Sequence, residues 1–150
     1  MSALRRAAVC LCLGCALALA ATGADANASP SPMVDKINKV RDAYGLPRMR
    51  YSRSLSRSSA RFANHLAETQ VFAHASRIRA SNRFSQLGEI LALMAGWEVR
   101  RSLTMAYWLR SWSHRAVLLN PSFRYVGAAR APGYFAGSPT LFWTVQFGRR

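Results

Sequence analysis

Cysteine is scarce in this sequence and is confined to its first 15 residues. The 150 residues contain only Cys10, Cys12 and Cys15. Every later part of the chain is therefore without cysteine, so no disulfide can link one of its segments to another. A domain built from these later residues must be stable through apolar packing alone, which a chain of this length can supply.

The sequence also lacks an apolar run long enough to cross a bilayer. The uncharged apolar stretch at residues 7–21 is shorter than the roughly 20 residues that a membrane-spanning helix needs. It follows two arginines and precedes small residues near Ala28, a pattern typical of a cleavable signal peptide. We therefore predict a signal peptide at 1–28 and a single secreted or periplasmic domain at 29–150, with no stable membrane span after signal removal. A lipid-modified Cys15 and a retained membrane anchor are the alternatives.

Acidic residues are few, with six against 21 lysines and arginines. Removing residues 1–28 takes away two arginines and one aspartate, which leaves a net charge of +14. Arginine, which makes up 17 of the 19 remaining basic residues, can grip phosphate or carboxylate groups through paired hydrogen bonds. This charge favours an anionic partner, although a solvated basic surface without a specific ligand is the alternative. The export signal argues against nucleic acid as that partner.

The hydrophobic pattern predicts helices first and strands later. Apolar residues at helical spacing, with Ser31 and Ser113 placed as N-caps, predict four helices. We expect these helices at 32–44, 54–70, 98–111 and 113–119. The third is apolar on two faces, which predicts that it is covered on most sides. Short apolar runs predict strands at 88–93, 123–130 and 141–147, the last two separated by a turn-rich connection. This order predicts an α+β domain, a small antiparallel sheet covered by helices.

Histidine is scarce too, and two of the three histidines follow predicted helices. His74 comes directly after the second helix and His114 after the third, where their side chains could converge on a cleft. Glu89 lies in an apolar strand, and a buried carboxylate needs a partner such as histidine or arginine. The three residues could hold a divalent metal such as Zn or Ca, or form a polar cluster without metal. His65 is expected to be a partly exposed helix residue.

Motifs of several hydrolase classes are missing. The sequence has no His-Glu-x-x-His pair, no Cys/His cluster and no Gly-x-Ser-x-Gly segment. A serine nucleophile could come only from Ser76, Ser111 or Ser113, beside His114 and Glu89. No local motif supports that arrangement.

Five short motifs in order resemble the bacterial branch of the CAP superfamily, named for cysteine-rich secretory proteins, antigen 5 and pathogenesis-related proteins. The motifs are His74-Ala75-Ser76, Gly88-Glu89-Ile90, the segment from Trp108 through Ser111 and His114 to Pro121, Tyr125-Val126-Gly127, and Phe142 to Gly148. The resemblance covers residues 33–148. It implies a three-layer α/β/α sandwich, a secreted or envelope location, and a cleft built around two histidines and two glutamates.

The resemblance also assigns positions in that cleft. It places His74 and His114 at the two histidine positions and Glu89 at the first glutamate. Ser111 stands at the second glutamate, which removes one metal ligand and one negative charge. This substitution weakens a metal site and favours a cluster without metal.

Three functions are consistent with these observations. The first is a non-enzymatic module that binds an anionic or amphipathic envelope ligand, a lipid or a cell-wall component, in the His/Glu-lined cleft. Aromatic residues are expected near that cleft, namely Phe72, Trp97, Trp108 and Trp112, although a place in the core would explain them equally well. The second is a metal-assisted hydrolase or peptidase that uses His74, Glu89 and His114. The third is a structural or partner-binding module, for which we expect Glu89→Leu to cost little stability and His74→Ala to cost more.

Overall fold

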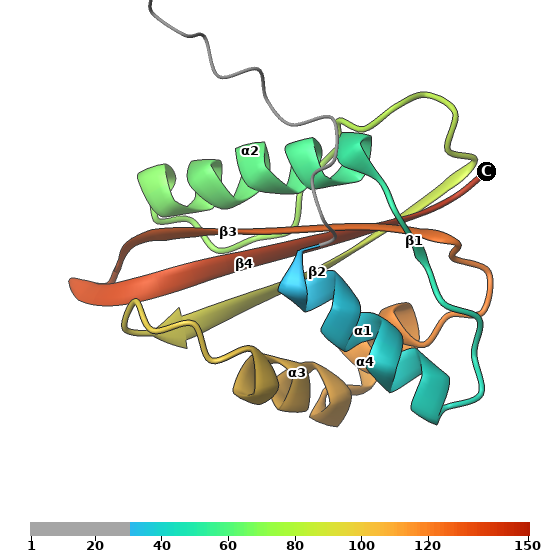
Figure 1. Cartoon of the computed structure of the whole chain (residues 1–150). Coiled ribbons are helices and arrows are strands. Elements are labelled where there is room, and N and C mark those ends of the chain that lie inside the picture. The colour runs from blue at the N-terminus through green and yellow to red at the C-terminus, as the bar shows by residue number, and fades with distance from the viewer. Residues whose placement is uncertain (1–30) are drawn as a thin grey trace, which may run out of the picture.

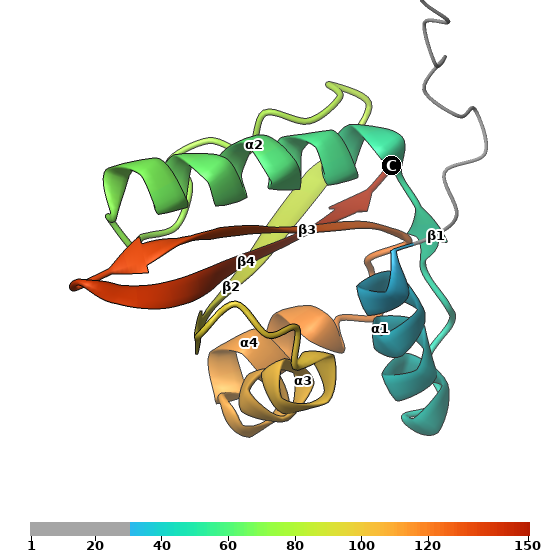
Figure 2. The same ribbon diagram turned by 60° about the vertical axis from the view of Figure 1, so that its left-hand side comes forward.

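The computed structural model describes residues 31–150, and it has three layers (Figures 1 and 2). Helix α2 covers one face of a sheet, and the other three helices cover the opposite face. The helices are α1 (Pro32–Ala43), α2 (Arg53–Thr69), α3 (Arg101–Arg110) and α4 (Trp112–Leu118), and the strands are β1 (Arg50–Tyr51), β2 (Gln86–Ala95), β3 (Tyr125–Phe135) and β4 (Ser138–Arg149). The α+β sandwich is confirmed. The predicted signal peptide at 1–28, with its three cysteines, lies outside the described residues.

The sheet has the strand order β1-β3-β4-β2. Strand β4 pairs antiparallel with both β3 and β2, whereas the short β1 pairs parallel with β3. The sheet is therefore antiparallel except at one edge. Within residues 31–150, no helix combines the length and the apolar character needed to span a bilayer.

Strands β3 and β4 are longer than predicted, and the prediction of a long turn-rich connection between them is wrong. Strands β3 and β4 form a hairpin whose turn is only Ala136 and Gly137, both with positive φ. Pro132 lies in β3 beyond the short pairing with β1, and Pro139 lies in β4 beyond its last pair with β2. Each proline therefore stands where one side of its strand needs no backbone donor, so both fit in the sheet.

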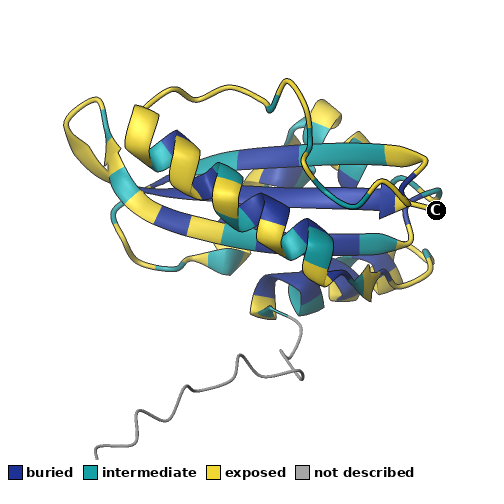
Figure 3. Cartoon of the chain, turned by 90° about the horizontal axis from the view of Figure 1, so that it is seen from above, coloured by how far each residue is buried: buried dark blue, intermediate teal, exposed yellow. Residues whose placement is uncertain are grey.

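Strand β4 forms the centre of the core because both of its faces are covered (Figure 3). One face packs against the layer of α1, α3 and α4 through the four residues predicted to share it: Leu141, Trp143, Val145 and Phe147. The other face packs under α2, where Phe142 joins Leu66 and Leu91. This two-sided burial explains why β4 is a nearly continuous apolar run.

The helix starts follow from their capping residues. Ser31 Oγ accepts a hydrogen bond from the Met33 amide, and Ser52 Oγ accepts one from the Leu55 amide. The predicted capping by Ser31 is confirmed, whereas Ser113 is inside α4 and Ser111 is its N-cap residue. Because α4 starts at Trp112, His114 lies in the first turn of this helix.

Helix α3 is shorter and more exposed than predicted. It starts at Arg101, because Gly96 turns the chain with a φ of +76° and Trp97 donates a hydrogen bond to the Gly133 carbonyl. Leu103 and Tyr107 lie on its exposed side. The prediction that this helix is covered on most sides is therefore wrong.

Strand β2 is an edge strand, and it lies between two segments that carry histidines. The segment that follows α2 leads into β2 on one side of the sheet, and α4 packs near β2 on the other. The buried Trp108 of α3 donates its indole N–H to the Leu91 carbonyl at 2.8 Å. The free edge of β2 is thus the place where residues from both helical layers can meet.

Candidate functional site

Glu89 is the anchor of the site. It lies on β2 directly opposite Gln146 of β4, on the face of the sheet that α2 covers, and its side chain is only 5% exposed. Its Oε1 accepts hydrogen bonds from the Ala75 amide and His74 Nδ1, both at 3.0 Å. Its Oε2 accepts one from Gln146 Nε2 at 2.8 Å. The expectation that this carboxylate has a histidine partner is confirmed, and two neutral donors hold it as well.

The two histidines lie in opposite layers; His74 bonds this carboxylate, and His114 interacts with His74. His74 lies in the segment after α2 with its side chain 60% exposed, and His114 lies half-buried on α4. Burial, together with the nearby charge of His74, lowers the pKa of His114 below its usual 6.5. We call His74, Glu89 and His114 the histidine cluster. Its two imidazoles lie near one another at the free edge of β2.

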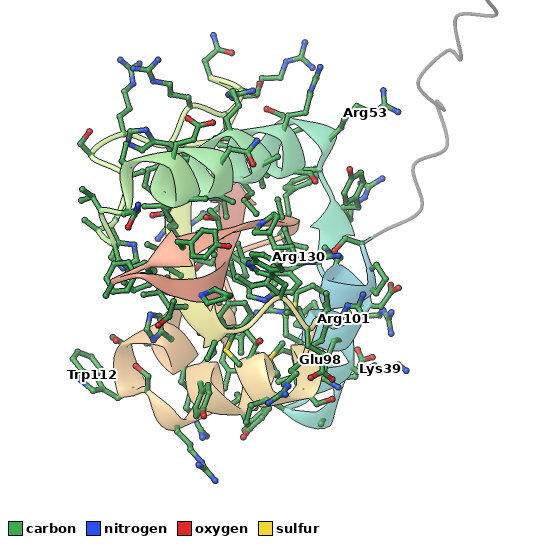
Figure 4. The ribbon with its side chains drawn as sticks, turned by 90° about the vertical axis from the view of Figure 1, so that its left-hand side faces the viewer. Lys39, Arg53, Glu98, Arg101, Trp112 and Arg130 are labelled. Carbon is green, nitrogen blue, oxygen red and sulfur yellow. The ribbon has the colours of Figure 1, made fainter. Side chains whose placement is uncertain are left out.

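The other predicted cleft residues divide into exposed and buried ones. Ser111 is half-buried, and its Oγ lies 3.2 Å from the Ser113 Oγ. Phe72 is 40% exposed, and Trp112 is 83% exposed and projects into solvent in Figure 4. Trp108, by contrast, is 1% exposed and belongs to the core. Its placement as a ligand-contacting residue is therefore wrong.

The fourth aromatic residue, Trp97, lies away from the histidine cluster. It follows the far end of β2 and packs edge-to-face against Tyr134 of the β3–β4 hairpin. Of the four aromatics predicted near the cleft, only Phe72 and Trp112 are thus both exposed and adjacent in sequence to the cluster residues.

The donor set does not fit a divalent cation. In the part of the chain from residue 31 onward, no group of three histidine, cysteine, aspartate or glutamate side chains is arranged to hold a metal ion. The carboxylate of Glu89 already accepts three hydrogen bonds, and Ser111 supplies no second carboxylate. We therefore derive no chemical step through Zn or Ca.

Two partners of Glu89 were not foreseen in the sequence. The Ala75 amide cannot be recognised from residue type, because any residue there would supply the same N–H group. Gln146 carries a usable signal, since alternation along 141–147 puts it on the opposite face from the apolar residues. Only the pairing register of β2 with β4 places it against Glu89.

These contacts reverse the stability order expected from sequence. Glu89→Leu should lower the free energy of unfolding by about 1–3 kcal/mol, because it leaves the Ala75 amide and the Gln146 amide group without their acceptor. His74→Ala should cost about 0–1 kcal/mol, because the His74 side chain is largely exposed and Glu89 keeps its other two donors. Urea unfolding of both variants measures the difference. A larger loss for His74→Ala would contradict this account of the carboxylate.

Acid should destabilise the protein through His114. Its pKa is lowered in the folded state, so its contribution to stability is complete above pH 6.5 and is lost as the pH falls. Between about pH 7.5 and about pH 5.5 the thermal midpoint should fall further than it does in His114→Gln. An equal pH dependence of the natural protein and His114→Gln would contradict the lowered pKa of His114. His65→Gln, at an exposed helix position, is the matched control.

The comparisons with known proteins agree on one fold. The family model described as the cysteine-rich secretory protein family, CAP, matches residues 34–147. No protein with a curated function matches the sequence.

Several solved structures resemble this chain at low sequence identity. An outer surface protein from Borrelia burgdorferi is similar with a TM-score of 0.64 and 21% identity, over 79% of this chain and 90% of the other. An extracellular protein containing a SCP domain from Bacillus anthracis has a TM-score of 0.60 and 22% identity, over 79% of this chain but only 39% of the other. Venom allergen-like protein 4 from Schistosoma mansoni has a TM-score of 0.57 and 9% identity, over 78% and 83%. At these identities the likeness supports a shared fold.

Proposed function

The chain belongs to the cysteine-rich secretory protein (CAP) family, and from this premise we propose that it is an exported, non-enzymatic binding domain. Its ligand is an anionic or amphipathic component of the cell envelope, a lipid or a cell-wall component. The ligand is bound at the surface around the histidine cluster. The proposed location rests on the signal-peptide pattern at 1–28, and two similar structures are named as an outer surface protein and an extracellular protein.

The observation that carries the proposal is the state of Glu89. Both of its oxygens accept hydrogen bonds within the protein, and its side chain is nearly buried. A general base needs an oxygen within hydrogen-bond reach of the proton that it removes. The carboxylate of Glu89 instead fixes the segment at His74 and Ala75 on the sheet. A carboxylate that holds a surface segment in place suits a binding site. A carboxylate whose oxygens are already bonded within the protein does not supply the free base that a hydrolase would need at this position.

The surface around the cluster has the character that such a ligand requires. His74 supplies an exposed imidazole, and Phe72 and Trp112 supply exposed aromatic area beside the two histidine positions. The net charge of +14 on residues 29–150 attracts anions over the whole surface. An amphipathic molecule can then be held by its charge and by apolar contact together.

Binding to isolated envelope components tests the proposal. The purified protein is sedimented with phosphatidylglycerol vesicles, lipopolysaccharide or peptidoglycan in low salt and in about 0.5 M salt, where surface charge is strongly screened. We expect binding to at least one component, weakened by salt, and weakened again in the His74→Asn/His114→Asn double variant. The Ser102→Ala variant is the control because Ser102 lies on the exposed side of α3, outside the cluster. Absence of binding to every component, or binding indifferent to salt, would overturn the proposal.

A further inference from the structure

A concave site lies beside the histidine cluster and contains none of its three residues, although Ala75 and Gln146, which donate hydrogen bonds to Glu89, line it. A groove of about 360 Å³ lies between α2 and the segment at 75–79, and Gln146 of β4 forms part of its wall. Its lining consists of Ser58, Arg61, Phe62, His65, Ala75, Ser76, Arg77, Arg79 and Gln146. The volume is within the range of about 300–1,000 Å³ that is usual for small-molecule sites.

The walls of this groove are basic. Arg61 comes from α2, whereas Arg77 and Arg79 come from the facing segment, and no carboxylate belongs to the lining. Arg61 Nη2 donates a hydrogen bond to the Arg79 carbonyl at 2.7 Å, which ties the two walls together. Among residues 31–150, neither Arg77 nor Arg79 forms an ion pair. Their guanidinium groups are therefore available to an anionic group, which arginine can grip through two parallel hydrogen bonds.

Gln146 adds a requirement for a hydrogen-bond donor. Its Nε2 is committed to Glu89 at 2.8 Å, so its amide group is held in one orientation. Its Oε1 is buried and has no hydrogen-bond partner in the described part of the chain. A buried oxygen without a partner is unfavourable, so a hydroxyl group placed against it would be stabilising.

An aromatic wall completes the groove. Phe62 is half-buried and stacks on His65 at 5.9 Å between ring centroids, with an interplanar angle of 25°. Both rings belong to the lining, so they give the groove an aromatic wall against which the ring of a small molecule can lie.

We propose that this groove binds a small organic anion that carries hydroxyl groups on a ring, the chemistry that sugar phosphates and uronic acids share. The anionic group lies between Arg77 and Arg79. A ring hydroxyl donates to Gln146 Oε1, and the face of the ring lies on Phe62. The site goes beyond the function proposed above, because it contains none of the three residues of the histidine cluster.

Histidine NMR signals distinguish the two sites, since the chain has only three histidines. The purified protein is titrated with glucose 6-phosphate, glucuronate, inorganic phosphate and glucose, and the imidazole signals are followed. We expect glucose 6-phosphate or glucuronate to shift the His65 signal with little effect on His114. If the His65 shift saturates at a lower concentration of glucose 6-phosphate, the preferred anionic group is phosphate. If it saturates at a lower concentration of glucuronate, the preferred group is carboxylate. Glucose and inorganic phosphate should each bind about tenfold more weakly or worse, because each lacks one of the two recognised features.

A charge-matched pair of double variants tests the role of the arginines. Arg77→Gln/Arg79→Gln should weaken binding about tenfold or more, because two charge-assisted contacts are lost. Arg57→Gln/Arg83→Gln removes the same charge from α2 and the same segment but outside the lining, so binding should be nearly unchanged. Equal weakening by both pairs, equally tight binding of inorganic phosphate, or no His65 shift with any probe would overturn the proposal. A shift confined to His74 and His114 would also overturn it, while leaving the function proposed for the histidine cluster standing.

Discussion

Gly127→Ala is expected to destabilise the domain strongly. A Cβ atom at this position of β3 would lie 2.1 Å from the Ser56 amide nitrogen and 2.4 Å from the Leu55 carbonyl carbon. Both neighbours are backbone atoms in the first turn of α2, so relief requires the whole helix to move away from the sheet. Such overpacking costs about 3 kcal/mol or more, a large part of the roughly 5–15 kcal/mol that a domain has in total. Circular dichroism with urea unfolding measures the loss.

Gly148→Ala is the matched control for this substitution. A Cβ atom there would lie 2.6 Å from the ring of Phe84, which is only 9% exposed but is a single side chain that can shift without moving a helix. We expect a loss of about 1 kcal/mol, clearly smaller than that of Gly127→Ala. Similar losses at the two positions would show that α2 does not require close contact with β3 at Gly127.

Arg41→Met is expected to lower the free energy of unfolding by about 4 kcal/mol, because it removes three charge-assisted hydrogen bonds from the interior. Arg41 is fully buried, and within residues 31–150 it has no acidic partner. Its Nε donates to the Pro47 carbonyl, and its Nη1 donates to the carbonyls of Leu118 and Asn120, each at 3.0 Å. Burial, and then repulsion from Arg124, lowers the pKa of Arg41. The charge is stabilised by the carbonyls at the end of α4, where a helix favours a cation.

The effect of Arg41 should extend to the site, because α4 carries His114. We expect the imidazole signal of His114 to shift in Arg41→Met, whereas that of His65 on α2 stays in place. Arg41→Lys is the conservative control, since an ammonium keeps the charge and part of the bonding, and it should cost less than half as much in urea unfolding. Equal stability of the Met variant and the natural protein would show that the three carbonyls do not depend on this guanidinium.

Much of the fold is readable from the sequence because its elements have strong local signals. Ser31 and Pro32 determine the start of α1, and the alternation along 141–147 identifies both faces of β4. The errors lie where a tertiary contact overrides a local preference. Pro132 and Pro139 favour a turn when read alone, yet strand pairing accommodates both at positions where a neighbouring strand is missing.

The candidate site can be predicted in part, because one of its residues also has a strong local signal. Glu89 in an apolar strand demands a partner, and this demand together with the CAP resemblance points to His74. The sequence does not reveal that a backbone amide and Gln146 share the carboxylate, because both contacts depend on register and loop path. Trp108 was misplaced because an aromatic residue in a cleft motif and one in a core look alike in sequence. Its hydrogen bond to the Leu91 carbonyl decides between them.

The hydrogen bond from Trp108 to the Leu91 carbonyl also affects the tendency of the protein to aggregate at high concentration. Unpaired backbone groups at the edge of a sheet can template the addition of another chain, which leads to aggregation. Here β1 covers only the first two residues of β3 at one edge, and at the other edge the indole of Trp108 occupies the carbonyl of Leu91. Trp108 therefore interrupts the row of backbone acceptors that a second molecule would need to extend the sheet at β2, and it does so without a disulfide.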